Sequence, residues 1–482
     1  MDDVDKRTKE AFVAGLAGTS AREVFLVFAI APGTVWLYSE LLLLLLDIVG
    51  RNERSSVHKL HLVQQILLEF AVTVVPTMIG FTFTEYAVPL LATVYCFAAL
   101  LCALSRIHAN ASMHKHCRKE KMNQLLGKEL PFLTNFRAQI MLSTCFAILA
   151  VDFTIFPRRF AKTENYGYSV MDIGVGAFIL SSAIVSAPAR QGRASIMTKR
   201  SQSGHKSSQG FAQRCYDFLR PVALVLVFGI ARFLAVKGVN YQEHVSEYGV
   251  HWNFYFTLAG VYLMYSFLRA FGNWATSPVV ALSIALGYQV YLSRYGGEEY
   301  ILHAPRDDLM GQNREGILSL AGYTSLYMLS VTAGQRIFAC IDANGSKAQR
   351  NMRWLVLTLV AVTVILWLST YLSVRLVARP SRRMLNMSYL LWVLAESAFL
   401  LAIYCVIQTV CMLPRVPLLF QGINHNQLFV FVVANLMTGA VNLSMHTIDT
   451  EPIGAAAVLL VYMLVVCVLA SVLQHAHVRI KL

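Results

Sequence analysis

The stretch from Asp152 to Glu164 contains the residue types that activation of an alcohol requires. Asp152 ends an apolar run, and Lys162 follows before the next one. An ionisable side chain inside an apolar run is costly to bury, so it marks a functional candidate. We expect Asp152 to act as a general base on an alcohol, and Lys162 to orient it or to stabilise an oxyanion. The alternative is structural: Asp152 would form an ion pair with Arg158, Arg159 or Lys162 and so join two helix ends.

Other charged residues nearby could hold a substrate. Arg158 and Arg159 form a guanidinium fork suited to a phosphate at a bilayer surface. Asp172 lies in the following apolar run, beside Gly174 and Gly176, which would let helix backbones or a lipid chain approach closely. We expect Asp172 to be either paired or functional. Further acids inside apolar runs, whose partners the sequence does not reveal, are Glu40, Glu69 and Glu396.

The segment 241–253 combines two acids with a histidine. Glu243, Glu247 and His251 would share one face if this segment were helical. Such a face could bind a metal, but it contains no ligand triad of known spacing, so we favour a solvated or hydrogen-bonded face and predict no metal site.

Polar residues recur at helical spacing near the C-terminus. In a bilayer such a stripe must face other helices or a polar cavity, so it predicts either contacts between helices or the lining of a headgroup pocket. The stripe consists of Asn435, Thr438, Asn442, His446 and Asp449.

Two apparent motifs carry little weight. His303 and Asp308 fit the HxxxxD acyltransferase pattern, but two fixed residues occur readily by chance. His108, His114, His116 and Cys117 resemble a metal cluster, yet they lie in a basic loop where a solvated tract is the simpler explanation.

The elements that must position these residues are membrane-spanning helices. Hydrophobic residues make up 56% of the 482 residues and charged residues only 14%, and a span takes about 20 apolar residues. We predict an all-α, polytopic membrane protein with about thirteen spans in one bundle, a single domain over 1–482. The predicted spans are 24–46, 62–83, 86–106, 138–156, 167–188, 217–236, 253–270, 278–294, 317–340, 354–378, 387–412, 427–447 and 455–474. The first, third and eighth are the weakest, because Gly and Pro interrupt them.

Composition also excludes several classes of protein. The formal charge of +14 is spread over the loops between apolar runs, which argues against nucleic-acid binding. The nine cysteines are scattered without a CxxC pair, so we expect no disulfide or zinc framework. The first 20 residues lack the apolar stretch of a signal peptide, so the first span must itself direct insertion.

Lysine and arginine counts predict the orientation, because positively charged short loops stay in the cytosol. The basic loops 107–137 and 189–216 dominate the count. They place the N-terminus in the lumen and the C-terminus in the cytosol. The segments 157–166, 237–252, 295–316 and 379–386 then face the lumen.

Five strings spread along the chain resemble one family. They are AVDFTIFPRRFAKTENYGYSVMDIGVG (150–176), YQEHVSEYGVHWNFYFTL (241–258), NREGILSLAGY (313–323), YLLWV (389–393) and FVVANLMTGAVNLSMHTID (431–449). Together they resemble the inositol acyltransferases of glycosylphosphatidylinositol (GPI) anchor biosynthesis, the PIG-W and GWT type. The loops 107–137 and 189–216 contain no such string.

The resemblance implies a multi-pass enzyme of the endoplasmic reticulum. Its members move a fatty acyl chain, usually palmitoyl, from acyl-CoA to the inositol 2-hydroxyl of glucosaminyl-phosphatidylinositol, with no metal and no tightly bound cofactor. The family's proposed catalytic pair, the acid before FPRRF and the lysine after it, corresponds to Asp152 and Lys162. We assign substrate binding to Arg158, Arg159, Asp172, His251, Asn253, Asn313, Arg314, Asn435, Asn442 and His446.

Other functions fit some of the same residues. A lipid transporter or scramblase would use the buried acids without covalent chemistry, although we see no inverted repeat, which many transporters carry. A structural subunit would leave the Asp152 to Lys162 cluster unexplained. An acyltransferase built on an intramembrane histidine would need His251 or His446 as its base.

Four sequons occur, at Asn110, Asn344, Asn386 and Asn442. The predicted orientation places the first two in cytosolic loops and the others in or against a span. We therefore predict no N-glycan.

Overall fold

The computed structural model describes residues 3–52, 62–108, 130–190, 211–238, 245–341, 346–411 and 416–480, and the elements within these ranges are helices. The chain divides into two compact units that interleave along the sequence. Unit 1 comprises 1–18, 161–342 and 364–397, and unit 2 comprises 19–160, 343–363 and 398–482.

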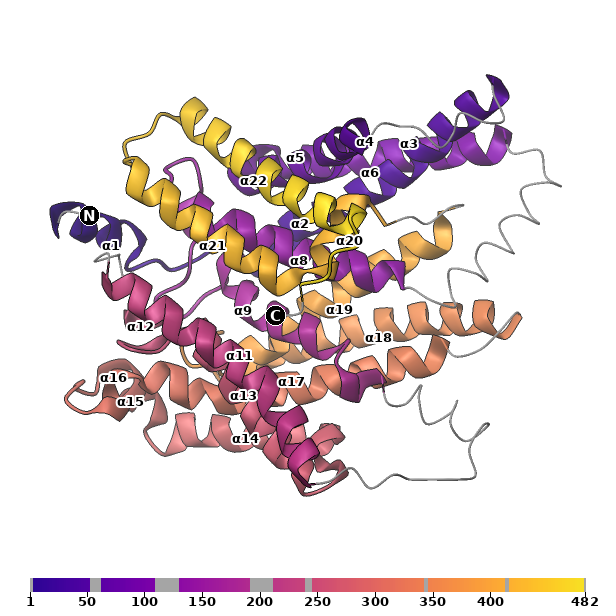
Figure 1. Cartoon of the computed structure of the whole chain (residues 1–482). Coiled ribbons are helices and arrows are strands. Elements are labelled where there is room, and N and C mark those ends of the chain that lie inside the picture. The colour runs from indigo at the N-terminus through magenta and orange to yellow at the C-terminus, as the bar shows by residue number, and fades with distance from the viewer. Residues whose placement is uncertain are drawn as a thin grey trace. The chain divides into compact units, whose positions relative to one another are not determined.

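Unit 1 contains three of the segments that were predicted to face the lumen, 237–252, 295–316 and 379–386. Its helices are α1 (Asp3–Val13), α9 (Val170–Ala183), α11 (Phe211–Gly238), α12 (Val245–Tyr248), α13 (Phe254–Ala270), η5 (Asn273–Thr276), α14 (Pro278–Arg294), α15 (Gly297–His303), α16 (Leu309–Gln312) and α17 (Arg314–Ile341). The long α17 packs against α9, α13 and α14, and α13, α14 and α17 run beside one another in Figure 1.

Unit 2 is built around α8. Its helices are α2 (Ala21–Phe28), α3 (Ile30–Asn52), α4 (Leu62–Glu69), η2 (Phe70–Val74), α5 (Val75–Thr82), η3 (Thr84–Tyr86), α6 (Ala87–His108), α8 (Pro131–Ala150), η4 (Arg158–Phe160), α20 (Leu418–His425), α21 (Gln427–Ser444) and α22 (Pro452–His475). Most residues of α8 are buried, and it packs against α20, α21 and α22. The remaining helices, α18 (Ser346–Leu376) and α19 (Met387–Val410), each contain a point where the chain changes unit.

Each of the thirteen predicted spans coincides with helical structure, but the helices differ in length. Within the described residues, nine helical segments are long and apolar enough to cross a membrane. The fifth, seventh and eighth spans correspond to the shorter helices α9, α13 and α14, and the described side chains of α11 give a shorter apolar helix, Val222–Ala235. Helical structure therefore lies at every position where hydropathy predicted a span, and the number of helices that cross the bilayer stays a prediction.

The glycine in the first predicted span serves close packing. A Cβ atom on Gly33 in α3 would lie 2.5 Å from Cε2 of Tyr95 in α6, and these two helices pack along one another. The first and third spans are among the nine long segments, although their Gly and Pro residues made them weak candidates. A missing Cβ that weakens a single helix can thus strengthen the contact between two.

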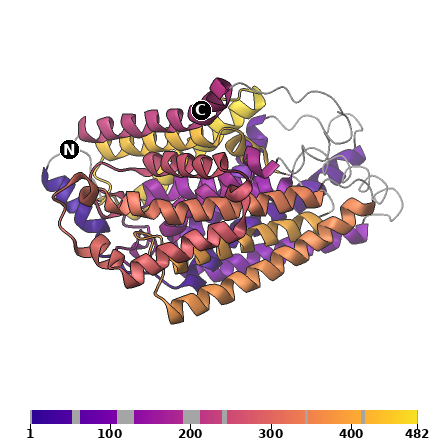
Figure 2. The same cartoon turned by 90° about the horizontal axis from the view of Figure 1, so that it is seen from below.

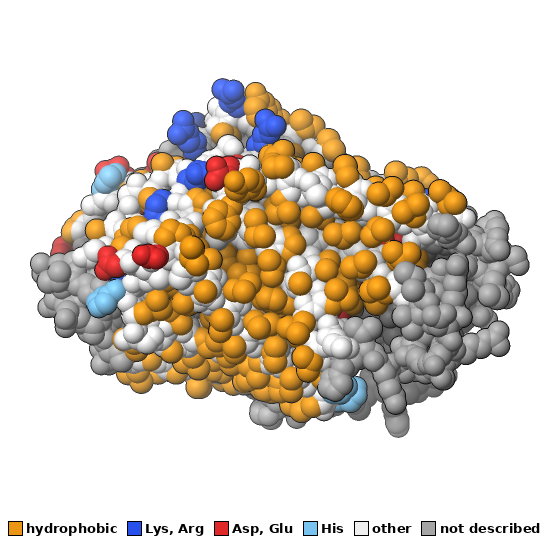
Figure 3. Space-filling model, turned by 90° about the horizontal axis from the view of Figure 1, so that it is seen from above, with side chains coloured by type: hydrophobic (Ala, Val, Ile, Leu, Met, Phe, Trp, Pro, Cys, Tyr) orange, Lys and Arg blue, Asp and Glu red, His pale blue; other side chains and the backbone are white. Residues whose placement is uncertain are grey.

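Exposed apolar side chains show which solvent these helices face. On α18, Leu357, Val364, Ile365, Leu368 and Leu372 are all more than half exposed. Hydrophobic side chains also cover much of the face in Figure 3, and Figure 2 shows that the elements beneath such side chains are helices. Water would oppose so large an apolar surface, whereas lipid accepts it. The protein is an all-α polytopic membrane protein.

Candidate functional site

Asp152 lies where α8 ends in unit 2. Its side chain is 6% exposed, and its backbone N–H donates to the carbonyl of Leu149. The Nδ2 atom of Asn442 in α21 donates to Asp152 Oδ2 at 2.7 Å. In turn, Thr447 Oγ1 donates to Asn442 Oδ1 at 3.4 Å. The structure thus brings together two predicted site residues, and a neutral amide fixes the orientation of the buried carboxylate.

Arg158 is held by the backbone of its own loop. Its guanidinium group donates to the carbonyl oxygens of Val151, Phe153 and Phe156 at 2.8–3.2 Å. Burial lowers the pKa of Arg158 to about 10, against the opposing charge of Asp152. The side chain is therefore still a cation at neutral pH, and it closes the turn that follows Asp152.

Arg159 faces other partners in the same unit. It forms an ion pair with Glu23 at 2.9 Å and also donates to Thr84. The Arg159 side chain is 46% exposed, whereas the Arg158 guanidinium group donates to backbone carbonyl oxygens. Because the two guanidinium groups have separate partners, Arg159 is the one better placed to take a phosphate, and that role stays a prediction.

The polar stripe near the C-terminus is shorter than predicted. Helix α21 ends at Ser444, so His446 and Asp449 lie in the connection to α22 and share no helical face with Asn442. Within α21, Asn435 Nδ2 donates back to the carbonyl of Phe431, and Thr438 Oγ1 to that of Ala434. The expectation of one helical stripe through Asp449 was wrong, because the chain turns before Pro452, which starts α22.

Lys162 lies in unit 1, so its surroundings are described apart from those of Asp152. Its Nζ atom forms an ion pair with Glu247 Oε1 at 2.6 Å, and the two side chains are 34% and 17% exposed. Burial by itself raises the pKa of Glu247, but the positive charges of Lys162, Arg382 and Arg232 outweigh it and lower the pKa to about 2. Glu247 is thus an anion that holds the Lys162 ammonium in place.

This ion pair predicts an acid sensitivity. Because the pKa of Glu247 falls from 4.5 to about 2 on folding, its contribution to stability is complete above about pH 4.5 and is lost as the pH falls toward 2. We expect Glu247→Gln to lower the free energy of unfolding by about 1–3 kcal/mol at pH 7. Thermal unfolding of both proteins from pH 7 to pH 3 measures this difference. A gap that does not narrow at low pH would contradict the assignment.

Glu247 and His251 do not share one helix, so the condition for a common helical face is not met. Helix α12 covers only Val245–Tyr248, and Glu243 lies outside the described residues. His251 instead meets Asn313: its backbone N–H donates to Asn313 Oδ1 at 2.8 Å, and its Nε2 lies 3.1 Å from Gln312 Oε1. The structure thus brings together two more of the predicted site residues, both in unit 1.

A glycine allows this approach. Gly249 has φ +123°, a conformation that side chains disfavour. A Cβ atom on it would lie 2.6 Å from Asn313 Cα, and the neighbouring Val250 N–H donates to the Gln312 carbonyl at 2.9 Å. The segment before α13 can therefore lie directly against the start of α17.

Asn253 and Arg314 use their polar atoms within the fold. Asn253 caps α13 by accepting from Tyr255 N and Phe256 N, and it donates to the carbonyl of Gly229. Arg314 is 2% exposed and donates to the carbonyls of Ile301, Ala304 and Pro305. The structure gives both residues a structural role, and substrate binding by either stays a prediction.

Asp172 is a paired acid. It is completely buried near the start of α9, where it accepts from Thr163 Oγ1 at 2.7 Å, from Thr163 N at 3.2 Å and from Arg382 Nε at 2.9 Å. Thr163 directly follows Lys162. The Arg382–Asp172 ion pair therefore fixes one side of the loop that carries Lys162.

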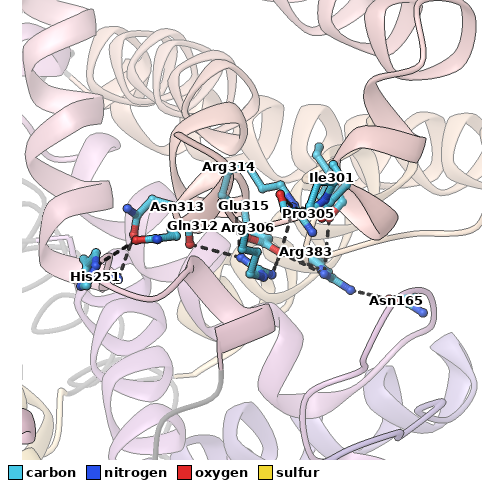
Figure 4. A network of polar contacts seen from close by, with 12 residues as sticks. Asn165, His251, Ile301, Pro305, Arg306, Gln312, Asn313, Arg314, Glu315 and Arg383 are labelled. Atoms are coloured by element: carbon cyan, nitrogen blue, oxygen red, sulfur yellow. Dashed lines mark hydrogen bonds and ion pairs between the residues drawn. The ribbon is translucent and has the colours of Figure 1, made fainter. Parts of the chain in front are cut away.

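Arg383 fixes the other side of this loop. Its Nη1 atom donates to Asn165 Oδ1 at 2.9 Å, and its Nη2 atom forms an ion pair with Glu315 at 2.9 Å. Figure 4 shows Arg306, Arg314 and Arg383 gathered around Glu315, which is completely unexposed. We call these four residues the Glu315 network.

Sequence reasoning did not single out Arg306, Glu315, Arg382 or Arg383. A signal was present: Arg382 and Arg383 are adjacent in a segment of eight residues between two apolar runs, and such a pair of cations can serve acids buried near the helix ends. His303 and Asp308 show no such role, because Asp308 caps α16 through the Gly311 N–H. The tract 109–117 lies outside the described residues.

The two described sequons are closed to glycosylation. Asn386 is 2% and Asn442 4% exposed, and the side chain of each is hydrogen bonded. We expect protein made in a eukaryotic membrane to carry no glycan at either position. Treatment with an endoglycosidase should leave its electrophoretic mobility unchanged. A mass shift assigned to Asn386 or Asn442 would contradict the packing, whereas Asn110 and Asn344 lie outside the described residues.

Comparison with known proteins relates nearly the whole chain to one family. Residues 5–473 match the profile of a family described as GWT1. "GPI-anchored wall transfer protein 1" of Aspergillus fumigatus is 35% identical over 521 aligned positions, which cover 100% of this chain and 99% of that protein. "Phosphatidylinositol-glycan biosynthesis class W protein" of Dictyostelium discoideum is 32% identical, with 100% of both chains covered. An uncharacterized protein of Arabidopsis thaliana is 36% identical over 74% of this chain and 77% of its own length.

Proposed function

The chain belongs to the GWT1 family, and from this membership we propose that it acts in GPI-anchor biosynthesis as an inositol acyltransferase. The observation that carries the proposal is the relationship over the full length to proteins named for GPI-anchored wall transfer and for phosphatidylinositol-glycan biosynthesis. The acceptor is the inositol 2-hydroxyl of glucosaminyl-phosphatidylinositol. The donor is acyl-CoA, with palmitoyl as the acyl chain.

Asp152 supplies the general base in this proposal. A secondary alcohol is a weak nucleophile at neutral pH, so a base within hydrogen-bond reach must take its proton. Asn442 donates to Asp152 Oδ2, and this contact orients the carboxylate. Asp152 takes the inositol proton as the oxygen attacks the thioester carbonyl carbon. When the carbon–sulfur bond breaks, the proton passes to the CoA thiolate, so that the ester and the free thiol are the products.

We assign charge compensation at the thioester oxygen to Lys162. Negative charge develops on this oxygen in the tetrahedral intermediate, and a fixed cation stabilises it. The ion pair with Glu247 uses one face of the ammonium group, and a lysine has further N–H donors for a substrate oxygen. Glu247 and the contacts of Thr163 and Asn165 limit the movement of this segment, which preorganisation requires.

The proposal includes a location and a set of partners. We place the enzyme in the membrane of the endoplasmic reticulum, with its N-terminus in the lumen and its C-terminus in the cytosol. Acyl-CoA is a co-substrate, and the reaction needs no metal or tightly bound cofactor because the thioester is already activated. Arg159 contributes to binding of the lipid phosphodiester.

The test is acyl transfer by the purified protein in liposomes. Labelled palmitoyl-CoA and glucosaminyl-phosphatidylinositol are supplied, and the acylated lipid is identified by mass spectrometry. We expect transfer to the inositol ring that depends on both substrates. Folded protein that moves the lipid between leaflets without acylating it would overturn the proposal in favour of a scramblase.

A further inference from the structure

Helix α19 carries a carboxyl group that the structure leaves without a partner. Glu396 is 1% exposed, and neither of its oxygen atoms accepts or donates a hydrogen bond among the described residues. The other buried acids that the sequence left unexplained differ from it. Glu69 accepts from Tyr38 at 2.7 Å, and Glu40 accepts from Trp36 at 3.3 Å.

Two more polar groups on α19 are buried without a hydrogen-bond partner among the described residues. Trp392 Nε1, one helical turn before Glu396, and Ser397 Oγ, directly after it, are buried and have no hydrogen-bond partner in the described part of the chain. The Trp392 ring is packed edge-to-face against Tyr168 and Tyr389, with centroids 4.9 and 6.0 Å apart. Its N–H therefore cannot turn toward another acceptor without breaking these contacts. We call Trp392, Glu396 and Ser397 the α19 polar cluster.

Such a cluster weakens the fold unless it binds something. Each buried polar atom without a partner costs roughly 1–3 kcal/mol, and a charged one costs more. Water does not relieve this cost in the hydrocarbon region of a bilayer. A leucine at position 396 would pack without this penalty. An ionisable residue inside a membrane-spanning helix is by default a functional candidate, and here three unpartnered groups lie within six residues.

The donors and acceptors of the cluster define what would satisfy it. The carboxyl oxygens of Glu396 and the hydroxyl of Ser397 can accept hydrogen bonds, whereas Trp392 only donates. No lysine, arginine or histidine forms an ion pair with Glu396 in the described ranges. The complement is a cation with several N–H donors, next to an oxygen atom that accepts from an indole N–H. An amino sugar has this arrangement, because its ammonium group lies next to a ring hydroxyl group that can accept from the indole.

We propose that the α19 polar cluster is the subsite for the ammonium group of the glucosamine ring. Glu396 and Ser397 accept from the ammonium group, and Trp392 donates to a neighbouring sugar hydroxyl. This inference rests on the proposed function, which supplies a lipid with a free amine. It adds a determinant of specificity: the cluster selects the amine and rejects the N-acetylated sugar, whose neutral amide leaves the carboxyl group unpaired.

The cluster lies in contact with the loop that carries Lys162. Tyr168, which packs on Trp392, belongs to the segment between Lys162 and α9, and Tyr389 donates to the carbonyl of Asp172 at 2.6 Å. Both contacts lie within unit 1. A sugar held by α19 would therefore touch the same packed group of residues that positions the proposed catalytic lysine.

Binding of two lipids tests the inference without any acyl transfer. Glucosaminyl-phosphatidylinositol and its N-acetylated form are titrated into the full-length protein in detergent, in the absence of acyl-CoA. We expect wild-type protein to bind the amine about 100-fold more tightly, because the N-acetylated lipid leaves a buried carboxyl group unpaired. Glu396→Gln should lose most of this preference and retain its binding of the N-acetylated lipid. Glu299→Gln, an exposed acid on α15, is the control and should bind as wild type does.

The binding results test the amine subsite independently of the acyl-transfer assay. Equal binding of both lipids by wild-type protein would overturn the inference, even if Glu396→Gln does not fold. A folded Glu396→Gln protein with an unchanged preference would also overturn it. Protein that shows the amine preference but no acyl transfer would retain the subsite and refute the proposed reaction.

Discussion

Asp152→Asn is expected to remove most of the acyl-transfer activity while the protein remains folded. The amide has nearly the shape of the carboxylate, so Asn442 can still donate to its oxygen atom. It cannot take a proton from the inositol hydroxyl. General-base catalysis contributes about 10²–10⁴-fold to a rate, so we expect kcat to fall by that factor with little change in KM for acyl-CoA.

The measurement is initial-rate acyl transfer in liposomes, with thermal unfolding of each variant alongside. Asp307→Asn is the matched control, because Asp307 is an exposed aspartate and its replacement should leave both the rate and the unfolding temperature unchanged. A second variant, Asn442→Ala, should lower the rate less, because it frees the carboxylate without removing it. Folded Asp152→Asn protein with the wild-type rate would exclude Asp152 as the base.

Glu315→Ala is expected to be the most destabilising single change in unit 1. The carboxylate is unexposed and bonds Arg306 and Arg383, with Arg314 at 3.9 Å. Its loss leaves the buried Arg314 and Arg383 and the partly buried Arg306 close together without this anion. Breaking a buried ion pair by removing one partner costs about 3–5 kcal/mol, and here one anion serves three arginines.

The effect should extend to the loop of Lys162, because Arg383 also holds Asn165. Thermal unfolding in detergent and the yield of monodisperse protein measure the loss, with Glu299→Ala as the exposed control. Replacing Arg306 as well should restore part of the stability by reducing the excess positive charge. An unfolding temperature for Glu315→Ala within a degree or two of wild type would mean that the network is not required for folding.

The spans were predictable because hydropathy is a local property. Thirteen apolar runs became helices, since a backbone without water must satisfy its own hydrogen bonds. Helix ends were less predictable. The spacing of Asn435, Asn442 and His446 fits one helix, yet α21 stops at Ser444 because the connection to Pro452 must turn there.

In the candidate site, too, local features were predictable from the sequence and distant contacts were not. Asp152 and Lys162 stood out from the sequence because charge inside or beside an apolar run is rare. Their partners did not, because any of several polar residues could have reached them. Asn442 lies 290 residues from Asp152 along the chain, and Arg382 lies 210 residues from Asp172. Local pattern contains no information about such pairs.

The sequence by itself determined that this chain is a helical membrane protein of one recognisable family, with a small set of acids that burial makes expensive. Only the tertiary structure decided which partners, if any, compensate the charge of each buried acid. Asp172 and Glu315 are neutralised by arginines, Glu69 by neutral hydrogen-bond donors, and Glu396 by nothing in the described ranges. The reason is physical: the cost of burying a charge is a property of the residue, whereas its compensation depends on which distant side chains the fold brings within about 3 Å.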